Sequence, residues 1–265
     1  MSPFLSRILV AAVGLPVVLY LVWLGGVWLF VLAAVAATTA LHELFSIARP
    51  LRPLVLAGYT GALLALLGAW LGGTEWMAAG FMSTFALAFL LKGVSGTRQS
   101  VALAVATTVL GAGWIGVGLA HAVLLRAIPP TDDGRLAILA VLLAVFGADT
   151  AAYLVGRLIG RHRLAPAISP GKTWEGLVAG TVVAVLVPFF VLYQSDFLDV
   201  WRSLVLGAVI AVAAPIGDLF ESAVKRDLGV KDSGGLLLGH GGMLDRLDAL
   251  LFASVASYYT ILALT

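Results

Sequence analysis

Long apolar segments constrain this chain more than any other feature, because a folded water-soluble protein has too little polar surface to cover them. Runs of about 17 to 26 mostly apolar residues recur along the whole sequence, and each is long enough for a helix to cross the hydrocarbon core of a bilayer. Hydrophobic residues make up 61% of the chain and charged residues only 11%, whereas a soluble domain has about 25% charged residues. The sequence therefore predicts a membrane protein whose spanning segments are helices.

The apolar runs, taken in order, give nine candidate spans. They are roughly 8–24, 26–42, 54–71, 76–92, 101–126, 135–157, 174–194, 202–224 and 247–264. Between the first two, only Gly25 and Gly26 suggest a turn. The run after Arg7 continues past any plausible cleavage site, so we interpret it as a membrane helix and not as a signal peptide.

We therefore expect an all-α, polytopic integral membrane helix bundle of about nine transmembrane helices. The expected organisation is a single membrane domain over 1–265, in which 1–134 holds helices of low motif content and 135–265 holds the catalytic helices and loops.

The distribution of positive charge predicts the orientation of these helices. With nine spans, Arg126, Arg135 and Arg202 lie on one side of the membrane, and the other 13 of the 16 Lys and Arg residues lie on the side of the N-terminus. Cytoplasmic loops carry the excess of Lys and Arg. We therefore expect a multi-pass protein of the inner (cytoplasmic) membrane, with its N-terminus and its active site facing the cytoplasm.

Acidic residues at the end of the eighth span and the start of the ninth predict a metal site. Asp218 and Glu221 are three residues apart and share one face of a helix, which also carries Ser222 and Lys225. Asp245 and Asp248 have the same spacing. Carboxylates near the ends of membrane helices are costly and tend to face a partner or a watery cavity. Since Mg²⁺ is typically bound by one or two carboxylates plus substrate phosphates, the three aspartates are candidate ligands.

Basic and glycine residues in the same segment favour a site for phosphates. The basic residues are Lys225, Arg226, Lys231 and Arg246. The glycines are Gly234, Gly235, Gly239, Gly241 and Gly242. Glycine lets backbone N–H groups approach phosphate oxygens closely, and carboxylates, cations and glycines in one loop are typical of a phosphoanhydride site. The residues alone leave an alternative open, in which the aspartates only form salt bridges with the basic residues.

A second polar group precedes this segment. Asp149 lies well inside the sixth apolar run, where an ionisable residue is a functional candidate, although a structural pair with a nearby arginine is the alternative. A basic loop follows, whose arginines are also explained as orientation signals or contacts to lipid headgroups. It leads into SPGKTWEG at 169–176, which suits a turn into a helix start. Lys172 is expected beside the positive end of that helix, a favourable place for an anion.

The segment from Ser222 to Asp248, SAVKRDLGVKDSGGLLLGHGGMLDRLD, resembles the signature of the phosphatidate cytidylyltransferase (CDP-diglyceride synthase) family. The matching positions are Ser222, Lys225, Arg226, Lys231, Asp232, His240, Gly241, Gly242, Asp245, Arg246 and Asp248. GADTAAYLVGR and SPGKTWEG upstream are also similar to the family, so the resemblance covers roughly 145–250. Leu238 stands where the family usually has proline and Gly171 where a second lysine is common, and both departures bear on loop shape more than on chemistry.

The resemblance implies a nucleotidyltransferase of phospholipid biosynthesis, which converts CTP and phosphatidic acid into CDP-diacylglycerol and pyrophosphate with Mg²⁺ and room for a second cation. The metal ligands it implies are Asp218, Asp245 and Asp248, and the other catalytic residues are Lys225, Arg226 and Arg246. The substrate contacts are Asp149, Lys172, Ser222, Lys231, Asp232, His240, Gly241 and Gly242. The expected partners are CTP, phosphatidic acid, the lipid bilayer and a second copy of the chain in a homodimer, without nucleic acid.

Other functions compete with this hypothesis. A transporter that relays ions through Asp149 and Asp218 predicts transport in sealed vesicles without CTP or Mg²⁺. A CDP-alcohol phosphatidyltransferase is disfavoured because its D-G-x-x-A-R core is absent, and a structural scaffold is disfavoured by the intramembrane carboxylates. The chain has no cysteine and four histidines, which excludes disulfides and cysteine nucleophiles and argues against structural zinc.

Overall fold

The computed structural model describes the backbone of residues 3–94, 100–234 and 242–265, and side chains for the same residues except 3–13 and 93–94. The chain divides into two compact units. The first comprises residues 1–127 with 232–246, and the second comprises residues 128–231 with 247–265. The predicted organisation, a single membrane domain with helices of low motif content over 1–134 and catalytic helices and loops over 135–265, stays a prediction.

Helices make up the first unit. They are α1 (Pro3–Leu24), α2 (Gly26–Ile47), the short 3-10 helix η1 (Arg49–Leu51), α3 (Val55–Val94), α4 (Val101–Gly111), the π-helical segment η2 (Ala112–Val117) and α5 (Gly118–Arg126). Gly25 and Gly26 have φ angles of 66° and 54°, which confirms the turn expected between the first two helices. Arg126 donates to the carbonyl oxygens of Val22 (3.0 Å) and Trp23 (2.9 Å), and so caps the last turn of α1.

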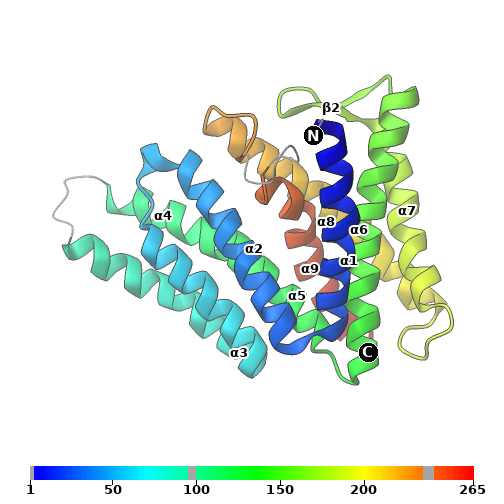
Figure 1. Ribbon diagram of the computed structural model, residues 1–265, viewed down its shortest axis with the longest axis horizontal. Coiled ribbons are helices and arrows are strands. Elements are labelled where there is room, and N and C mark those ends of the chain that lie inside the picture. Colours follow the sequence, from blue (N-terminus) through cyan, green and yellow to red (C-terminus); the bar gives the residue numbers. More distant parts are fainter. Residues whose placement is uncertain (1–2, 95–99, 235–241) are drawn as a thin grey trace. The chain divides into compact units, whose positions relative to one another are not determined.

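Helix α3, cyan in Figure 1, consists of two arms joined at Gly72 and Gly73, whose backbone angles are not helical. Gly73 has a φ of 74°, a conformation that glycine reaches without steric cost. A Cβ atom at Gly68 would overlap the backbone of Trp76, and one at Gly80 would overlap that of Leu64. The two arms therefore pack closely against each other, which agrees with the separate runs 54–71 and 76–92 seen in the sequence.

The second unit contains α6 (Thr131–Ile159), β1 (Arg163–Ala165), β2 (Ser169–Thr173), α7 (Trp174–Leu192), α8 (Val200–Asp227) and α9 (Leu244–Leu264) from residue 247 onward. The strands form an antiparallel hairpin in which Arg163 lies opposite Thr173 and Ala165 opposite Ser169. The sequence predicts a loop over 157–173 without indicating a hairpin. Strands of three and five residues are too short to show an alternation of apolar and polar residues, so the sequence does not reveal them.

Helices α6 and α7 lie side by side and position the hairpin that joins them (Figure 1). A Cβ atom at Gly176 would come within 2.6 Å of the carbonyl oxygen of Ala152, so the two helices approach as closely as their backbones allow. The hydroxyl of Thr173 accepts the N–H of Gly176 at 3.1 Å and caps the start of α7. This cap confirms the helix start predicted at SPGKTWEG.

Within the part of the chain that the structure describes, seven helices are long and apolar enough to cross a membrane. Both arms of α3 count as one of these seven, and Gly14–Leu24 of α1 adds a shorter apolar helix. The expected all-α, polytopic membrane fold is confirmed. The number of nine spans stays a prediction.

Candidate functional site

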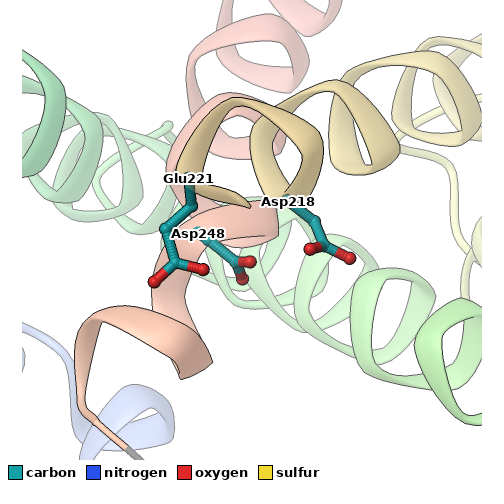
Figure 2. Close-up of side chains that lie close together, drawn as sticks. All are labelled: Asp218, Glu221 and Asp248. Atoms are coloured by element: carbon teal, nitrogen blue, oxygen red, sulfur yellow. The ribbon is translucent and has the colours of Figure 1, made fainter. Parts of the chain in front are cut away.

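Three carboxylates converge where α8 meets α9 in the second unit (Figure 2). Asp218 and Glu221 come from α8 and Asp248 from α9, and one oxygen of each lies within 4.8 Å of the others. Glu221 is 2% exposed and Asp248 is 6% exposed. Asp218 is only half-buried, with 31% of its side chain exposed. Hard oxygen ligands with one accessible member suit a divalent cation such as Mg²⁺.

The local sequence explains why these groups meet. Asp218 and Glu221 are three residues apart and therefore lie on one face of α8. Gly217 lets α9 come close at this point, because a Cβ atom there would overlap the carbonyl oxygen of Asp248. One turn further on, the rings of Phe220 and Phe252 pack with their centroids 5.5 Å apart.

Two lysines supply positive charge beside the cluster. Lys172, at the end of β2, forms an ion pair with Asp218. Lys225 forms a buried ion pair with Glu221, with Nζ 3.0 Å from Oε2. The third carboxylate, of Asp248, accepts the N–H of Ala249 at 2.7 Å. Uncompensated charge is costly at low dielectric, so these contacts stabilise the cluster.

A cavity of about 720 Å³ adjoins the cluster within the same unit. Its wall combines acidic and basic side chains, namely Asp149, Arg157, Arg163, Lys172 and Asp218. Asp218 therefore belongs to both the carboxylate cluster and the cavity. The hydroxyl of Tyr153, another wall residue, accepts a hydrogen bond from Arg157 at 2.7 Å and orients its guanidinium group.

Three further candidate residues, at or just beyond the end of α8, lie outside the carboxylate cluster. Arg226 donates to the carbonyl oxygens of Ile168 (3.2 Å) and Val230 (3.4 Å), and so holds the turn of the β hairpin against α8. Ser222 is partly buried, and Lys231, beyond the end of α8, is exposed. Contacts between these residues and a substrate stay predictions.

The remaining candidates belong to the first unit. Asp245 accepts the N–H of Gly242 at 2.8 Å, while Asp232 and Arg246 are exposed. The roles predicted for these four residues, including metal binding by Asp245, stay predictions. His240 and Gly241 lie outside the described residues.

Sequence reasoning did not assign three residues that the geometry brings into the site. Glu221 is part of the carboxylate cluster, and its spacing of three from Asp218 was the available signal. Arg157 and Arg163 line the cavity. The helical spacing of Arg157 from Asp149 and Tyr153 was the available signal for the first, whereas the basic loop around Arg163 favoured a role in membrane orientation. The arrangement offers oxygen ligands for a cation next to cations for phosphate, which is the chemistry that phosphoryl and nucleotidyl transfer needs.

Comparison with known proteins gives two consistent results. A family model described as the cytidylyltransferase family matches residues 5–264. Proteins named phosphatidate cytidylyltransferase from Staphylococcus haemolyticus, Staphylococcus saprophyticus and Staphylococcus aureus are each 34% identical to this chain over 254 residues. Each of these matches covers 93% of this chain and 94% of the relative.

Proposed function

This chain belongs to the cytidylyltransferase family, and from this premise we propose that it transfers the cytidylyl group of CTP to phosphatidate, which yields CDP-diacylglycerol and pyrophosphate. It is a polytopic membrane nucleotidyltransferase of phospholipid biosynthesis. The observation that carries the proposal is the dual position of Asp218, which belongs to a carboxylate cluster and also lines a cavity with basic side chains. Cation ligands and phosphate-binding groups are therefore adjacent.

The reaction makes one phosphorus–oxygen bond and breaks another. An oxygen of the lipid phosphate bonds to the α-phosphorus of CTP, and the bond from that phosphorus to the oxygen bridging to the β-phosphate breaks. The electron pair of the broken bond leaves with pyrophosphate. The nucleophile is already an anion, so a general base is not required. The protein must instead lower the repulsion between two anions and hold them in line.

The basic residues of the cavity wall are suited to that task. Arg157 and Arg163 each present a planar guanidinium group that binds two phosphate oxygens at once. Lys172 adds a compact charge beside Asp218. These three residues bind and orient the phosphates of the lipid and the nucleotide, and Tyr153 holds Arg157 in place.

The carboxylate cluster fits Mg²⁺ in donor type. Ligands of an octahedral Mg²⁺ ion, with oxygens at about 2.1 Å, lie about 3.0 to 4.2 Å apart, so the carboxylate oxygens, which lie within 4.8 Å of one another, would have to move closer around a bound ion. Asp218, Glu221 and Asp248 would hold the ion, with Asp245 as the further ligand implied by family resemblance. When bound there, the ion would supply positive charge beside the reacting phosphates. Lys172 and Lys225 offset two of the three negative charges of the cluster, so the second cation that the family resemblance allows stays a prediction.

The sidedness and assembly of the enzyme belong to the same proposal. The excess of Lys and Arg on the side of the N-terminus supports a cytoplasmic N-terminus and an active site that opens to the cytoplasm, where CTP is available. Phosphatidate enters laterally from the bilayer. We also propose a location in the cytoplasmic membrane and, from the family resemblance alone, a homodimer.

A substrate assay tests the proposed function. Purified protein is incubated with phosphatidate, Mg²⁺ and one labelled nucleoside triphosphate at a time, and both pyrophosphate and CDP-diacylglycerol are measured. We expect both products with CTP and neither without Mg²⁺. Absence of product with every nucleotide, from protein that remains folded in detergent, would contradict the proposal.

A further inference from the structure

Glu43, near the end of α2, is a buried carboxylate that binds the backbone at the start of α9. Its Oε1 atom accepts the N–H of Met243 at 2.9 Å, and its Oε2 atom accepts the N–H of Leu244 at 2.9 Å. The hydroxyl of Ser233 donates to the same Oε2 atom at 3.3 Å. Glu43 is 2% exposed. All four residues belong to the first unit, so one side chain joins α2 to a segment about 200 residues later.

Two glycines give this carboxylate the space it occupies. A Cβ atom at Gly234 would lie 2.8 Å from Oε1 of Glu43, and one at Gly242 would lie 2.5 Å from Oε2. Glycine is therefore required at both positions for the backbone to pack directly on the carboxylate. The N–H of Gly242 donates to Asp245, so the segment that contacts Glu43 also contacts a predicted metal ligand.

The contacts are specific for a carboxylate. The two backbone donors bind different oxygens, so a glutamine would satisfy one N–H and direct its own NH₂ group at the other. The N–H groups at the start of a helix lack partners within the helix and carry a partial positive charge, which favours an anion. Asp245 caps the N–H of Gly242, and Glu43 caps the next two, so acidic side chains satisfy three consecutive N–H groups at the start of α9.

We propose that Glu43 is a positioning residue for nucleotidyl transfer, which acts by fixing the start of α9. Asp245 and Arg246 follow directly after the two residues that it holds, and Asp248 lies one turn further along the same helix. The register and direction of α9 determine where these side chains point. The part of this inference that concerns catalysis rests on the proposed function, whereas the tether itself does not.

The test compares Glu43→Gln, which keeps the size of the side chain, with Glu43→Asp, which keeps both acceptor oxygens. Glu75→Gln is the matched control, because Glu75 is an exposed glutamate at the start of the second arm of α3. Hydrogen exchange of the Met243 and Leu244 amides reports the tether, while kcat, KM for CTP and the Mg²⁺ concentration for half-maximal activity report the site. Thermal unfolding in detergent reports stability.

For Glu43→Gln we expect faster exchange at both amides, a kcat about tenfold or more below the wild-type value and a higher Mg²⁺ requirement. KM for CTP should change little, whereas the melting temperature should fall, because one buried N–H group loses its acceptor. Glu43→Asp should recover part of the kcat, and Glu75→Gln should match the wild type. If Glu43→Gln does not fold, a reduced kcat and raised Mg²⁺ requirement in folded Glu43→Asp carry the test.

Other outcomes would overturn the inference. Unchanged exchange at Met243 and Leu244 in Glu43→Gln would refute the tether. Faster exchange with wild-type kcat and Mg²⁺ dependence, or a loss of activity that follows only the loss of folded protein, would refute positioning and leave a structural role. A wild-type protein that makes no CDP-diacylglycerol, with these amides protected, would refute the proposed function and leave the tether intact.

Discussion

Lys172 and Asp218 form an ion pair that joins the end of β2 to α8, and both side chains are partly exposed. Lys172 directly precedes the residue that caps α7, so the pair links the hairpin, the start of α7 and the carboxylate cluster. Each partner has a stronger competitor in the proposed reaction, namely a phosphate for the lysine and a divalent cation for the aspartate. We therefore expect substrate and cation to separate the pair when they bind together.

Substitution of Lys172 tests this exchange of partners. Lys172→Met keeps most of the apolar length and removes the charge. A hydrogen bond to a charged group contributes about 1.5–3 kcal/mol, so kcat/KM should fall by about 10- to 100-fold. Lys172→Arg keeps the charge and should retain more activity than Lys172→Met. Equal kcat/KM in wild type and Lys172→Met would show that the lysine does not bind substrate.

The aspartates of the proposed metal site are tested by Asp218→Asn, Asp245→Asn and Asp248→Asn. Each change should lower kcat by about 100-fold or more, since it removes a charged ligand from the reacting centre, while the protein still inserts into the membrane. Asp132→Asn is a suitable control, because Asp132 is a surface residue paired with Arg135. Formation of CDP-diacylglycerol across a range of Mg²⁺ concentrations provides the measurement. Full activity in Asp245→Asn would exclude it as a ligand.

Glu221 has two explanations, as a metal ligand or only as the partner of Lys225. Glu221→Gln breaks a buried ion pair and should destabilise the protein by about 3–5 kcal/mol under either explanation. The double change Glu221→Gln with Lys225→Met removes both charges and should recover much of that stability. If Glu221 is a ligand, the double variant still needs a Mg²⁺ concentration at least about tenfold higher than wild type. A normal Mg²⁺ response in the stable double variant would show that Glu221 serves only as the ion-pair partner of Lys225.

The close approach of α8 and α9 depends on Gly217. In Gly217→Ala the new methyl group would overlap the carbonyl oxygen of Asp248 and approach the ring of Phe252 to 3.1 Å. Overpacking of this kind costs about 1–3 kcal/mol, and it displaces Asp248 from Asp218. We expect lower thermal stability together with a raised Mg²⁺ requirement. Gly14→Ala, where a Cβ atom meets nothing within 4 Å, should change neither property.

The membrane fold and several local structures could be predicted because their signals are local. Apolar runs of sufficient length identified the membrane helices, the Gly25–Gly26 pair marked a turn, and SPGKTWEG marked the start of α7. The spacing of polar residues placed Asp218 on a face of α8 shared with Glu221. Each of these inferences uses only residues within about one helix length of each other.

The contacts that join distant segments could not be predicted from spacing. Glu43 lies at the end of the second apolar run, where an interfacial role and a functional role are equally expected, and nothing nearby in the sequence indicates its bonds to Met243 and Leu244. Arg163 lies in a basic loop that an orientation signal explains better than a site does, and the helical spacing of Arg157 from Asp149 does not show what else these residues face. Only the packing of α6 against α7 places these arginines on the wall of one cavity with Asp218.

The orientation of the chain predicts which loops a membrane-impermeant thiol reagent reaches from each side. The natural sequence has no cysteine, so a single introduced cysteine reports one position without background. Ala167, in the turn of the β hairpin, and Gln194, after the end of α7, are both exposed and lie on either side of that one helix. In intact cells we expect labelling of Gln194→Cys and protection of Ala167→Cys, and inside-out vesicles should reverse the pattern. Each variant must keep its CDP-diacylglycerol synthesis for its labelling to count. Labelling of Ala167→Cys from outside would place the hairpin and the cavity on the external face, where CTP is absent, and would contradict both the predicted orientation and the access route of the nucleotide.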